Sequence, residues 1–399
     1  MHCRVCSTEG LLELVLDLGH QPWGNNFLTK EQIGHEAKYP LRLVWCSKCK
    51  TSQLDHTVSK EIMFSNHTYL SGTTQTLKNH FDVLSKRVKK EYFSQIDNPK
   101  ILDIGSNDGT QLSYYKNLNF EVLGVESSNN LVQIALENGI KTTHNYFDLN
   151  FALSLDYKFD LINASGVFFH LEDLHSACEA IKILLDKNGI FLVQFIYMQE
   201  MQKNSSFDQI YHEHLLYYNL ETINYLLNIY DLELFDAFLS PIHGGSVIGF
   251  VGHKNTKPIS ENLKTMIKQE KVLKSNELST YLQFAQSISG IKNKTTEWVS
   301  KLMNNEKKIM GLGAPVKGNT LLNYFGFDSK ILSGLLERNT SRRGLYAPGS
   351  HIPIIIEDEL DYFPDAYLVL AWNFKTEILE RHKKEVQMGT DFFFPIDPK

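Results

Sequence analysis

Apolar residues along the chain fall either into runs of strand length or into stretches with helical spacing. From residue 77 to 93 they recur on one face of a helix. Runs of strand length follow at Lys100–Ile104, 121–125, 159–164 and 189–195, and helical segments lie between them. Strands that alternate with helices in this way predict a parallel, doubly wound α/β sheet.

The second half of the chain continues with helices and strands of different spacing. Residues 215–230 have a helical pattern, and 232–239 with 246–253 are expected to form an antiparallel strand pair that closes the sheet. Amphipathic helices are expected between 260 and 308. A strand, a glycine-rich turn and a helix begin again at 308–320, which predicts a second, smaller α/β domain.

The turn after the first buried strand is composed like a ligand-binding turn. In a doubly wound sheet, ligands bind beyond the carboxyl ends of the strands. Gly105 and Gly109 allow a tight turn there, and Glu126 ends the next strand, where a carboxylate can bind ribose hydroxyls. We predict a cofactor site composed of Asp103, Gly105, Asn107, Asp108, Gly109 and Glu126.

The same turn favours a methyl donor over a dinucleotide. A nicotinamide-binding turn reads Gly-x-Gly-x-x-Gly and directs its amides at a pyrophosphate, whereas this turn reads Asp103-x-Gly105-x-x-x-Gly109. An acid at the strand end suits a cofactor that carries a positive ammonium group and no phosphate. S-adenosylmethionine fits that description, and a turn without any ligand is the alternative.

Four of the five cysteines form two C-x-x-C pairs, and Cys178 stands alone on an apolar helical face, where we expect it in the core. Paired C-x-x-C motifs in a reducing compartment favour a tetrahedral zinc site over disulfides. A redox dithiol is the alternative, but that motif normally follows a buried strand, and none precedes the first pair. Four thiolates close the coordination shell, so we predict a structural zinc bound by Cys3, Cys6, Cys46 and Cys49.

Length and motifs together predict three domains. A chain of 399 residues is too long for one compact core. We expect a zinc-binding module with a connector at 1–75, a cofactor-binding domain at 76–257 and a smaller substrate-binding α/β domain at 258–399.

The most reactive side chains are concentrated in one polar run, Tyr211-His212-Glu213-His214. Histidine is the natural proton acceptor near pH 7. Two histidines and a glutamate could also bind a metal, but the four cysteines already account for one. In an extended segment His212 and His214 would face opposite sides, so we expect one of them to face a cleft and the other to have a structural role.

Composition narrows the choice of partners. A net charge of −6 and a pI near 6.2 give no electrostatic argument for binding nucleic acid. No apolar run approaches the roughly 20 residues that a membrane span requires, and the N-terminal residues do not form an apolar signal segment. We therefore expect a cytoplasmic enzyme, and the oligomeric state stays open.

Further motifs occur at 104–110, 124–127, 167–170, 207–214, 243–246, 313–320, 346–353 and 371–374. With both cysteine pairs, they make nearly the whole chain similar to the bacterial sugar C-methyltransferases, which methylate carbon 3 of nucleotide-linked 4-keto-deoxysugars. That family combines an N-terminal zinc-binding module, a central S-adenosylmethionine domain and a C-terminal α/β domain.

The resemblance implies that His214 is the general base and that Tyr211, Glu213 and His170 surround the keto and hydroxyl groups of the sugar. A carbon next to a ketone becomes nucleophilic when its proton is removed, because an enolate forms. That step needs a base with a pKa near neutrality and hydrogen-bond donors for the oxyanion.

The substrate contacts expected from the resemblance are Tyr69, His243, Lys317 and Asn319. Lys317 and Asn319 follow a glycine turn at a helix start, which suits a nucleotide diphosphate. The connector departs from the family's Tyr-x-Tyr-x-Ser pattern, because His67 stands at the first tyrosine position. This departure suggests a different sugar.

Two other functions share many of these features. An O- or N-methyltransferase acting on a nucleotide sugar needs a base but no adjacent ketone. A non-catalytic sugar-nucleotide binding protein needs neither, but retention of Asp103, Glu126, Tyr211 and His214 together argues against loss of turnover.

Overall fold

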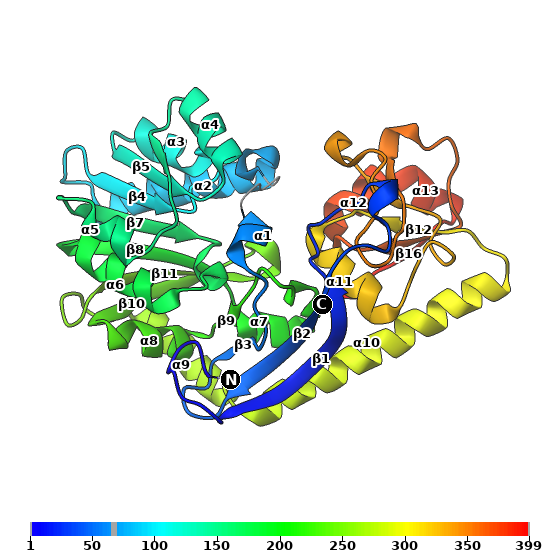
Figure 1. The fold of residues 1–399 in the computed structure, drawn as a ribbon, viewed down its shortest axis with the longest axis horizontal. Coiled ribbons are helices and arrows are strands. Elements are labelled where there is room, and N and C mark those ends of the chain that lie inside the picture. The colour runs from blue at the N-terminus through cyan, green and yellow to red at the C-terminus, as the bar shows by residue number, and fades with distance from the viewer. Residues whose placement is uncertain (1, 65–69, 398–399) are drawn as a thin grey trace.

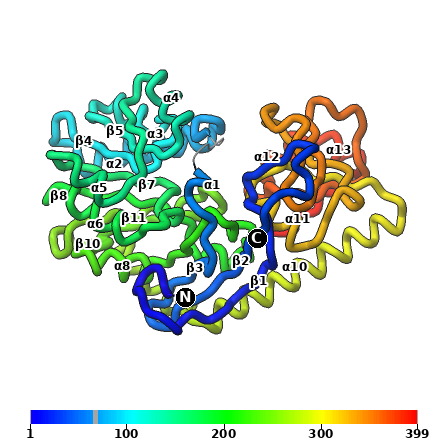
Figure 2. The backbone as a smooth tube through the Cα atoms, in the orientation of Figure 1, coloured from blue at the N-terminus to red at the C-terminus, as the bar shows by residue number. Residues whose placement is uncertain are grey.

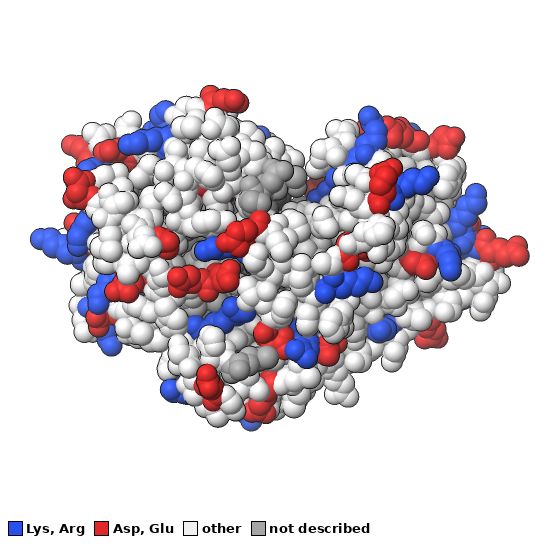
Figure 3. Space-filling model, in the orientation of Figure 1, with Lys and Arg blue, Asp and Glu red and all other residues white. Residues whose placement is uncertain are grey.

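The computed structural model describes residues 2–64 and 70–397, and the strands of this part of the chain form three sheets. Figure 1 shows the two larger sheets, with their helices, as separate lobes, and the smaller N-terminal sheet below and between them. Figure 3 shows the surface hollowed between the two lobes, with acidic and basic side chains interspersed on the face drawn.

The N-terminal sheet is antiparallel and has the order β1-β2-β3-β9. Its strands are β1 (Leu12–Pro22), β2 (Lys38–Cys46), β3 (Ser52–Leu54) and β9 (Leu216–Tyr217). The long β1–β2 hairpin extends from the N-terminus toward the C-terminal lobe (Figure 2). Short helix α1 (Lys60–Phe64) follows this sheet.

The central sheet has seven strands in the order β10-β11-β8-β7-β4-β5-β6. Strands β4 to β8 pair in parallel, and β10 and β11 add an antiparallel edge. The strands are β4 (Lys100–Ile104), β5 (Glu121–Glu126), β6 (Thr142–His144), β7 (Phe159–Ser165), β8 (Leu185–Ile196), β10 (Leu232–Ser240) and β11 (Ser246–His253). The predicted doubly wound α/β architecture is thus confirmed.

Helices cover both faces of the central sheet. One face packs against α2 (Gln75–Tyr92), α3 (Thr110–Asn117) and α4 (Asn129–Glu137). The other face packs against α5 (Leu149–Leu153), α6 (Leu174–Leu184) and α8 (Leu220–Ile229).

Local chemistry explains where these helices begin. The Thr74 side chain accepts a hydrogen bond from the Leu77 amide at the start of α2, and Asp173 caps α6 in the same way. Cys178 on α6 is fully buried in the core, as expected.

Residues 215–230 differ from the prediction of one continuous helix. Leu216–Tyr217 is strand β9, which pairs with Ser52–Leu54 of the N-terminal sheet, and the helix begins only at Leu220. Asn219 forms a capping box with Thr222 and so stops the helix from extending backward.

The C-terminal sheet is parallel and has the order β14-β13-β12-β15-β16. Its strands are β12 (Ile309–Leu312), β13 (Leu335–Glu337), β14 (Ile354–Ile356), β15 (Ala366–Val369) and β16 (Asp391–Phe393). Helix α11 (Val316–Phe325) packs on one face, and α12 (Lys375–Arg381) with α13 (Lys383–Met388) covers the other.

Two helices connect the lobes. Helix α9 (Glu261–Val272) packs beside the central sheet, and the 27-residue α10 (Leu278–Asn304) runs beneath both lobes to the C-terminal one (Figure 1). Helix α10 contacts β1, α7 (Met198–Asn204) and α11, so it touches the N-terminal sheet and both lobes.

The domain boundaries at 75/76 and 257/258 stay predictions. Within the described residues, every helix falls short of the length or the apolar character that crossing a membrane requires.

Candidate active site and zinc site

The four paired cysteines converge at the N-terminal end of the β1–β2 hairpin. Cys46 ends β2, and all four sulfur atoms lie within 4.8 Å of one another. The Sγ atoms of Cys3 and Cys49 are 3.5 Å apart, and those of Cys6 and Cys46 are 3.7 Å apart. Four ligands at ~2.3 Å in a tetrahedron lie about 3.8 Å from one another. The cluster therefore fits a zinc ion with a closed coordination shell.

The predicted cofactor turn lies between β4 and α3. Gly105 and Gly109 both have positive φ angles, 66° and 77°. The Glu126 carboxylate, at the end of β5, accepts hydrogen bonds from the amides of Asn107 (3.0 Å) and Ser128 (2.8 Å). Glu126 thus sits against the turn and still has lone pairs to offer a ligand.

Asp103 is a carboxyl group buried near the end of β4. It is 3% exposed and accepts a hydrogen bond from the Asn163 amide nitrogen at 2.5 Å. Burial, with a contribution from the Glu126 charge, raises the pKa of Asp103 to about 7 despite that bond. A ligand ammonium group would favour the charged form. The nearby Ser106 hydroxyl is also buried without a hydrogen-bond partner. These groups fit the amino-acid end of S-adenosylmethionine.

Two of the predicted cofactor residues also bind the backbone at Ser71 and Gly72. The Asn107 side chain accepts a hydrogen bond from the Ser71 amide, and the Asp108 carboxylate accepts one from the Gly72 amide, both at 2.9 Å. The described end of the connector, at Ser71 and Gly72, therefore lies against the turn, where it can help to enclose a ligand. The predicted substrate contact Tyr69 lies outside the described residues.

The rings of His214, Tyr211 and His170 come together. The His214 ring centroid lies 3.9 Å from that of Tyr211 and 5.0 Å from that of His170. His170 belongs to a 3₁₀ helix (Phe168–His170) that follows β7, and Tyr211 lies in the turn after another (Phe207–Gln209). Three of the predicted catalytic residues thus form one cluster.

His214 has a defined tautomer because its Nδ1 atom lies 2.8 Å from the Gln209 carbonyl oxygen. A carbonyl only accepts hydrogen bonds, so Nδ1 carries the proton and Nε2 keeps a lone pair. The side chain is 3% exposed. Burial and the nearby His170 and Lys317 hold the pKa of His214 well below its usual value, so the ring is neutral at pH 7.

The other members of the polar run have partners outside the ring cluster. Glu213 is 5% exposed and accepts a hydrogen bond from the Trp23 indole at 2.7 Å. His212 is buried with its ring edge-on to Tyr39 of β2, in the N-terminal sheet. His212 and His214 therefore face different parts of the molecule, although the run is a turn rather than an extended segment.

The C-terminal lobe reaches this turn through a buried charge pair. Asp208 is fully buried, and its Oδ2 atom lies 3.1 Å from Lys317 Nζ and accepts a hydrogen bond from Trp372 Nε1 at 2.7 Å. Lys317 also lies 4.6 Å above the Trp372 ring. Beside this pair, the Gln209 side chain donates to the His243 carbonyl at 2.7 Å.

The remaining predicted substrate residues differ in their surroundings. His243 is exposed and adopts a left-handed backbone conformation, with φ of 58°. Asn319 is buried, and its amide nitrogen donates to the Gly24 carbonyl at 2.7 Å. Asn319 therefore connects α11 to the loop after β1.

Sequence reasoning assigned no role to Asp208, Trp23 or Asn163. Asp208 lies inside the polar motif 207–214, and its position in that motif could have indicated a role in the site. Asn163 near the end of β7 could have been found as a polar residue in a buried strand. Trp23 lies 190 residues from its partner, and no local pattern indicates that contact.

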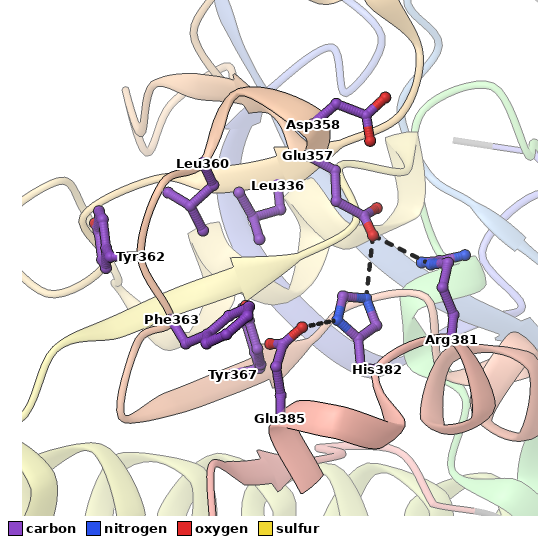
Figure 4. A pocket seen from close by; sticks show the side chains of 10 residues that line it. All are labelled: Leu336, Glu357, Asp358, Leu360, Tyr362, Phe363, Tyr367, Arg381, His382 and Glu385. Carbon is purple, nitrogen blue, oxygen red and sulfur yellow. Dashed lines mark hydrogen bonds and ion pairs between the residues drawn. The ribbon is translucent and has the colours of Figure 1, made fainter. Parts of the chain in front are cut away.

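A second charged cluster is formed by residues of α12, of α13 and between them, together with a residue after β14. It lies beside a cavity of about 190 Å³ (Figure 4). His382 contacts Glu385 at 2.7 Å and Glu357 at 3.2 Å, and Arg381 also binds Glu357. Burial disfavours the charged ring, but the two carboxylates outweigh it and raise the pKa of His382. This cluster joins α12 and α13 to the end of β14.

Three family models match consecutive parts of the chain. They are described as "Putative zinc binding domain" (residues 3–64), "Methyltransferase domain" (77–236) and "C-methyltransferase C-terminal domain" (241–397). C-methyltransferase NovU of Streptomyces niveus is 28% identical over 404 residues, which cover 99% of this chain and 95% of that protein.

Solved structures resemble part of the chain more distantly. Magnesium protoporphyrin IX methyltransferase of Synechocystis with bound SAM is 11% identical, with a TM-score of 0.34, over 44% of this chain and 79% of that one. The PH0226 protein of Pyrococcus horikoshii is 16% identical, with a TM-score of 0.37, over 50% of this chain and 100% of that one.

Metal analysis tests the cysteine cluster. We expect one zinc ion per chain, and we expect Cys49→Ser to lose it together with most of the stability of the N-terminal sheet, because bound zinc supplies ~10–16 kcal/mol of folding free energy in small zinc modules. Cys178→Ala is the control and should keep its zinc. A folded wild-type chain purified without metal would refute the zinc site.

The His382 cluster predicts a specific pH dependence of stability. Its pKa is higher in the folded chain than the ~6.5 of an unfolded one. The stabilisation of the folded chain by the ion pairs of His382 is therefore fully present below pH ~6.5, and it is lost as pH rises through the pKa of His382 in the folded chain. Thermal unfolding of wild type and His382→Gln from pH 6 to 9 should show a gap in Tm that narrows as pH rises. A gap that is constant or widens would contradict the charged state assigned to His382.

Proposed function

Because this chain belongs to the S-adenosylmethionine-dependent C-methyltransferases that combine these three domains, we propose that it methylates a carbon next to the ketone of a nucleotide-linked keto-deoxysugar, with His214 as the general base. The observation that carries the proposal is the neutral His214 ring, whose Nδ1 proton is held by the Gln209 carbonyl and whose Nε2 is left as a proton acceptor.

The residues around His214 suit enolate formation. A C–H bond next to a ketone is weakly acidic, so the base needs help from groups that stabilise the oxyanion. The Tyr211 hydroxyl and the His170 ring belong to the same cluster and supply candidate donors. Four thiolates would leave a bound zinc no free coordination site for the oxyanion, so we assign that stabilisation to these side chains.

Burial around His214 has two opposing effects. It keeps the ring neutral and able to accept a proton, and it makes the imidazolium that forms less stable. The enolate that forms in the same step is an anion close to that imidazolium. Their attraction offsets part of the cost of charging the ring in a site of low dielectric constant.

The cofactor would be held at the carboxyl ends of β4 and β5. Asp103 would bind the ammonium group, Glu126 the ribose hydroxyls, and Gly105 would allow close approach of the backbone. S-adenosylmethionine bound there supplies an electrophilic methyl group. This arrangement leaves proton abstraction to the histidine cluster on the neighbouring elements.

The nucleotide of the substrate is proposed to bind toward the C-terminal lobe. Lys317 lies at the start of the ten-residue helix α11, where both its charge and the helix N-terminus favour phosphate. Its ion pair with Asp208 keeps the ammonium in a fixed position before a substrate arrives. The exposed His243 and Asn319, a buried residue of α11 that binds the Gly24 carbonyl, complete the proposed substrate side.

Deuterium exchange tests the proposed base directly. Wild-type enzyme incubated in D₂O with a panel of nucleotide-linked 4-keto-deoxysugars, without cofactor, should exchange the hydrogen next to the ketone of its substrate, as followed by NMR. His214→Ala should slow both exchange and methyl transfer by roughly 10²–10⁴-fold, the usual contribution of a general base.

His212→Gln is the matched control, because His212 packs against Tyr39 of the N-terminal sheet. We expect it to retain exchange once its folding has been checked by thermal unfolding. Methyl transfer without any exchange in the wild type would favour an O- or N-methyltransferase. Full activity of His214→Ala would show that another residue is the base.

A further inference from the structure

Resting on the function proposed above, we propose that Trp23 is a positioning residue of the active site, which fixes the Glu213 carboxylate through its indole N–H. The zinc-binding module would then have a role beyond its own folding. It would contribute the indole N–H that holds Glu213, which neither of the two lobes provides.

Trp23 is placed for this role by the hairpin that ends beside it. It directly follows β1, whose other end lies by the cysteine cluster, and its Nε1 atom donates to Glu213 Oε1 at 2.7 Å. Glu213 is almost completely buried. A buried carboxylate requires a hydrogen-bond donor, and the indole N–H can only donate.

The loop that carries Trp23 is anchored on its far side to the C-terminal lobe. Leu28 and Tyr346 exchange backbone hydrogen bonds of 2.9 and 2.8 Å. The Glu36 carboxylate lies 2.6 Å from His351, and the Gly24 carbonyl accepts the bond from Asn319. Trp23 is therefore held between the zinc-binding hairpin and the C-terminal lobe, so its position over Glu213 depends on both.

Glu213 is balanced between its charged and neutral forms. Burial raises the pKa of Glu213 to about 7, and the hydrogen bond from Trp23 opposes that shift. Its chain neighbours His212 and His214 are turned to Tyr39 and to the Gln209 carbonyl, and the Lys317 charge faces Asp208. Loss of the indole N–H would therefore move Glu213 toward its protonated form at pH 7.

The four tryptophans provide an internal control for an NMR test. In protein labelled with [¹⁵N-indole]tryptophan, we expect the Trp23 N–H signal to shift with pH around a midpoint near 7 as Glu213 titrates. The Trp45 signal should stay flat, because Trp45 donates to the backbone carbonyl of Asn276, which does not titrate. Trp23→Phe identifies the signal by its loss, and Glu213→Gln should abolish its pH dependence. A Trp23 signal that ignores both pH and Glu213→Gln would overturn the proposal.

The catalytic consequence is measured with Trp23→Phe, which keeps an aromatic ring and removes the N–H donor. We expect the limb of the pH–kcat/KM profile that reports Glu213 to move up by about one pH unit. This shift corresponds to a tenfold change in the ratio of charged to protonated Glu213. Trp45→Phe, in the same module, should leave the profile in place. An unshifted profile in Trp23→Phe, with a wild-type enzyme that is active and a Glu213→Gln that is impaired, would overturn the positioning role.

The two proposals fail in different ways. If wild type neither methylates nor exchanges any keto-sugar of the panel, the proposed function fails, and the NMR titration still reports whether Trp23 controls Glu213. If wild type is active but Glu213→Gln and Trp23→Phe both match it, the function stands and the inference about Trp23 is wrong.

Discussion

The structure depends on the hydrogen-bond and charge partners that the buried polar groups of the turn from Phe207 to His214 require. An ionisable side chain removed from water is stable only if its charge or its hydrogen bonds find partners. In this turn the partners come from three places. Asp208 binds Lys317 and Trp372 of the C-terminal lobe, Glu213 binds Trp23 beside the N-terminal sheet, and His214 binds a carbonyl of its own segment.

This constraint explains why the proposed chemistry requires the whole chain. The proposed cofactor site, with Asp103 and Glu126, lies on the central sheet, but the turn from Phe207 to His214 is held from both sides. A zinc ion held by the four cysteines would act at a distance from the proposed chemistry, because it would stabilise one end of the hairpin while the other end holds the loop of Trp23. Such a metal would affect the geometry of the proposed site without touching the substrate.

Local patterns in the sequence were sufficient for the alternating strands and helices of the central sheet and for the glycine turn, since each is specified by residues close together in the chain. The repeated C-x-x-C spacing was sufficient for the cysteine cluster. The break in the expected helix at Leu216–Tyr217 could not be seen, because pairing with a strand far earlier in the chain overrides helical spacing. The contact of Trp23 with Glu213 was missed for the same reason. Asn107 illustrates a subtler limit: its place in the turn was predicted, but the bond of its side chain to the Ser71 amide was not.

The central claim is that the methyl group is transferred to a carbon. The most direct test is NMR of the product formed from a ¹³C-labelled keto-sugar nucleotide and S-adenosylmethionine with a ¹³C-labelled methyl group. We predict a one-bond coupling between the transferred methyl carbon and the sugar carbon next to the ketone. A methyl carbon attached to oxygen or nitrogen, without that coupling, would contradict the account.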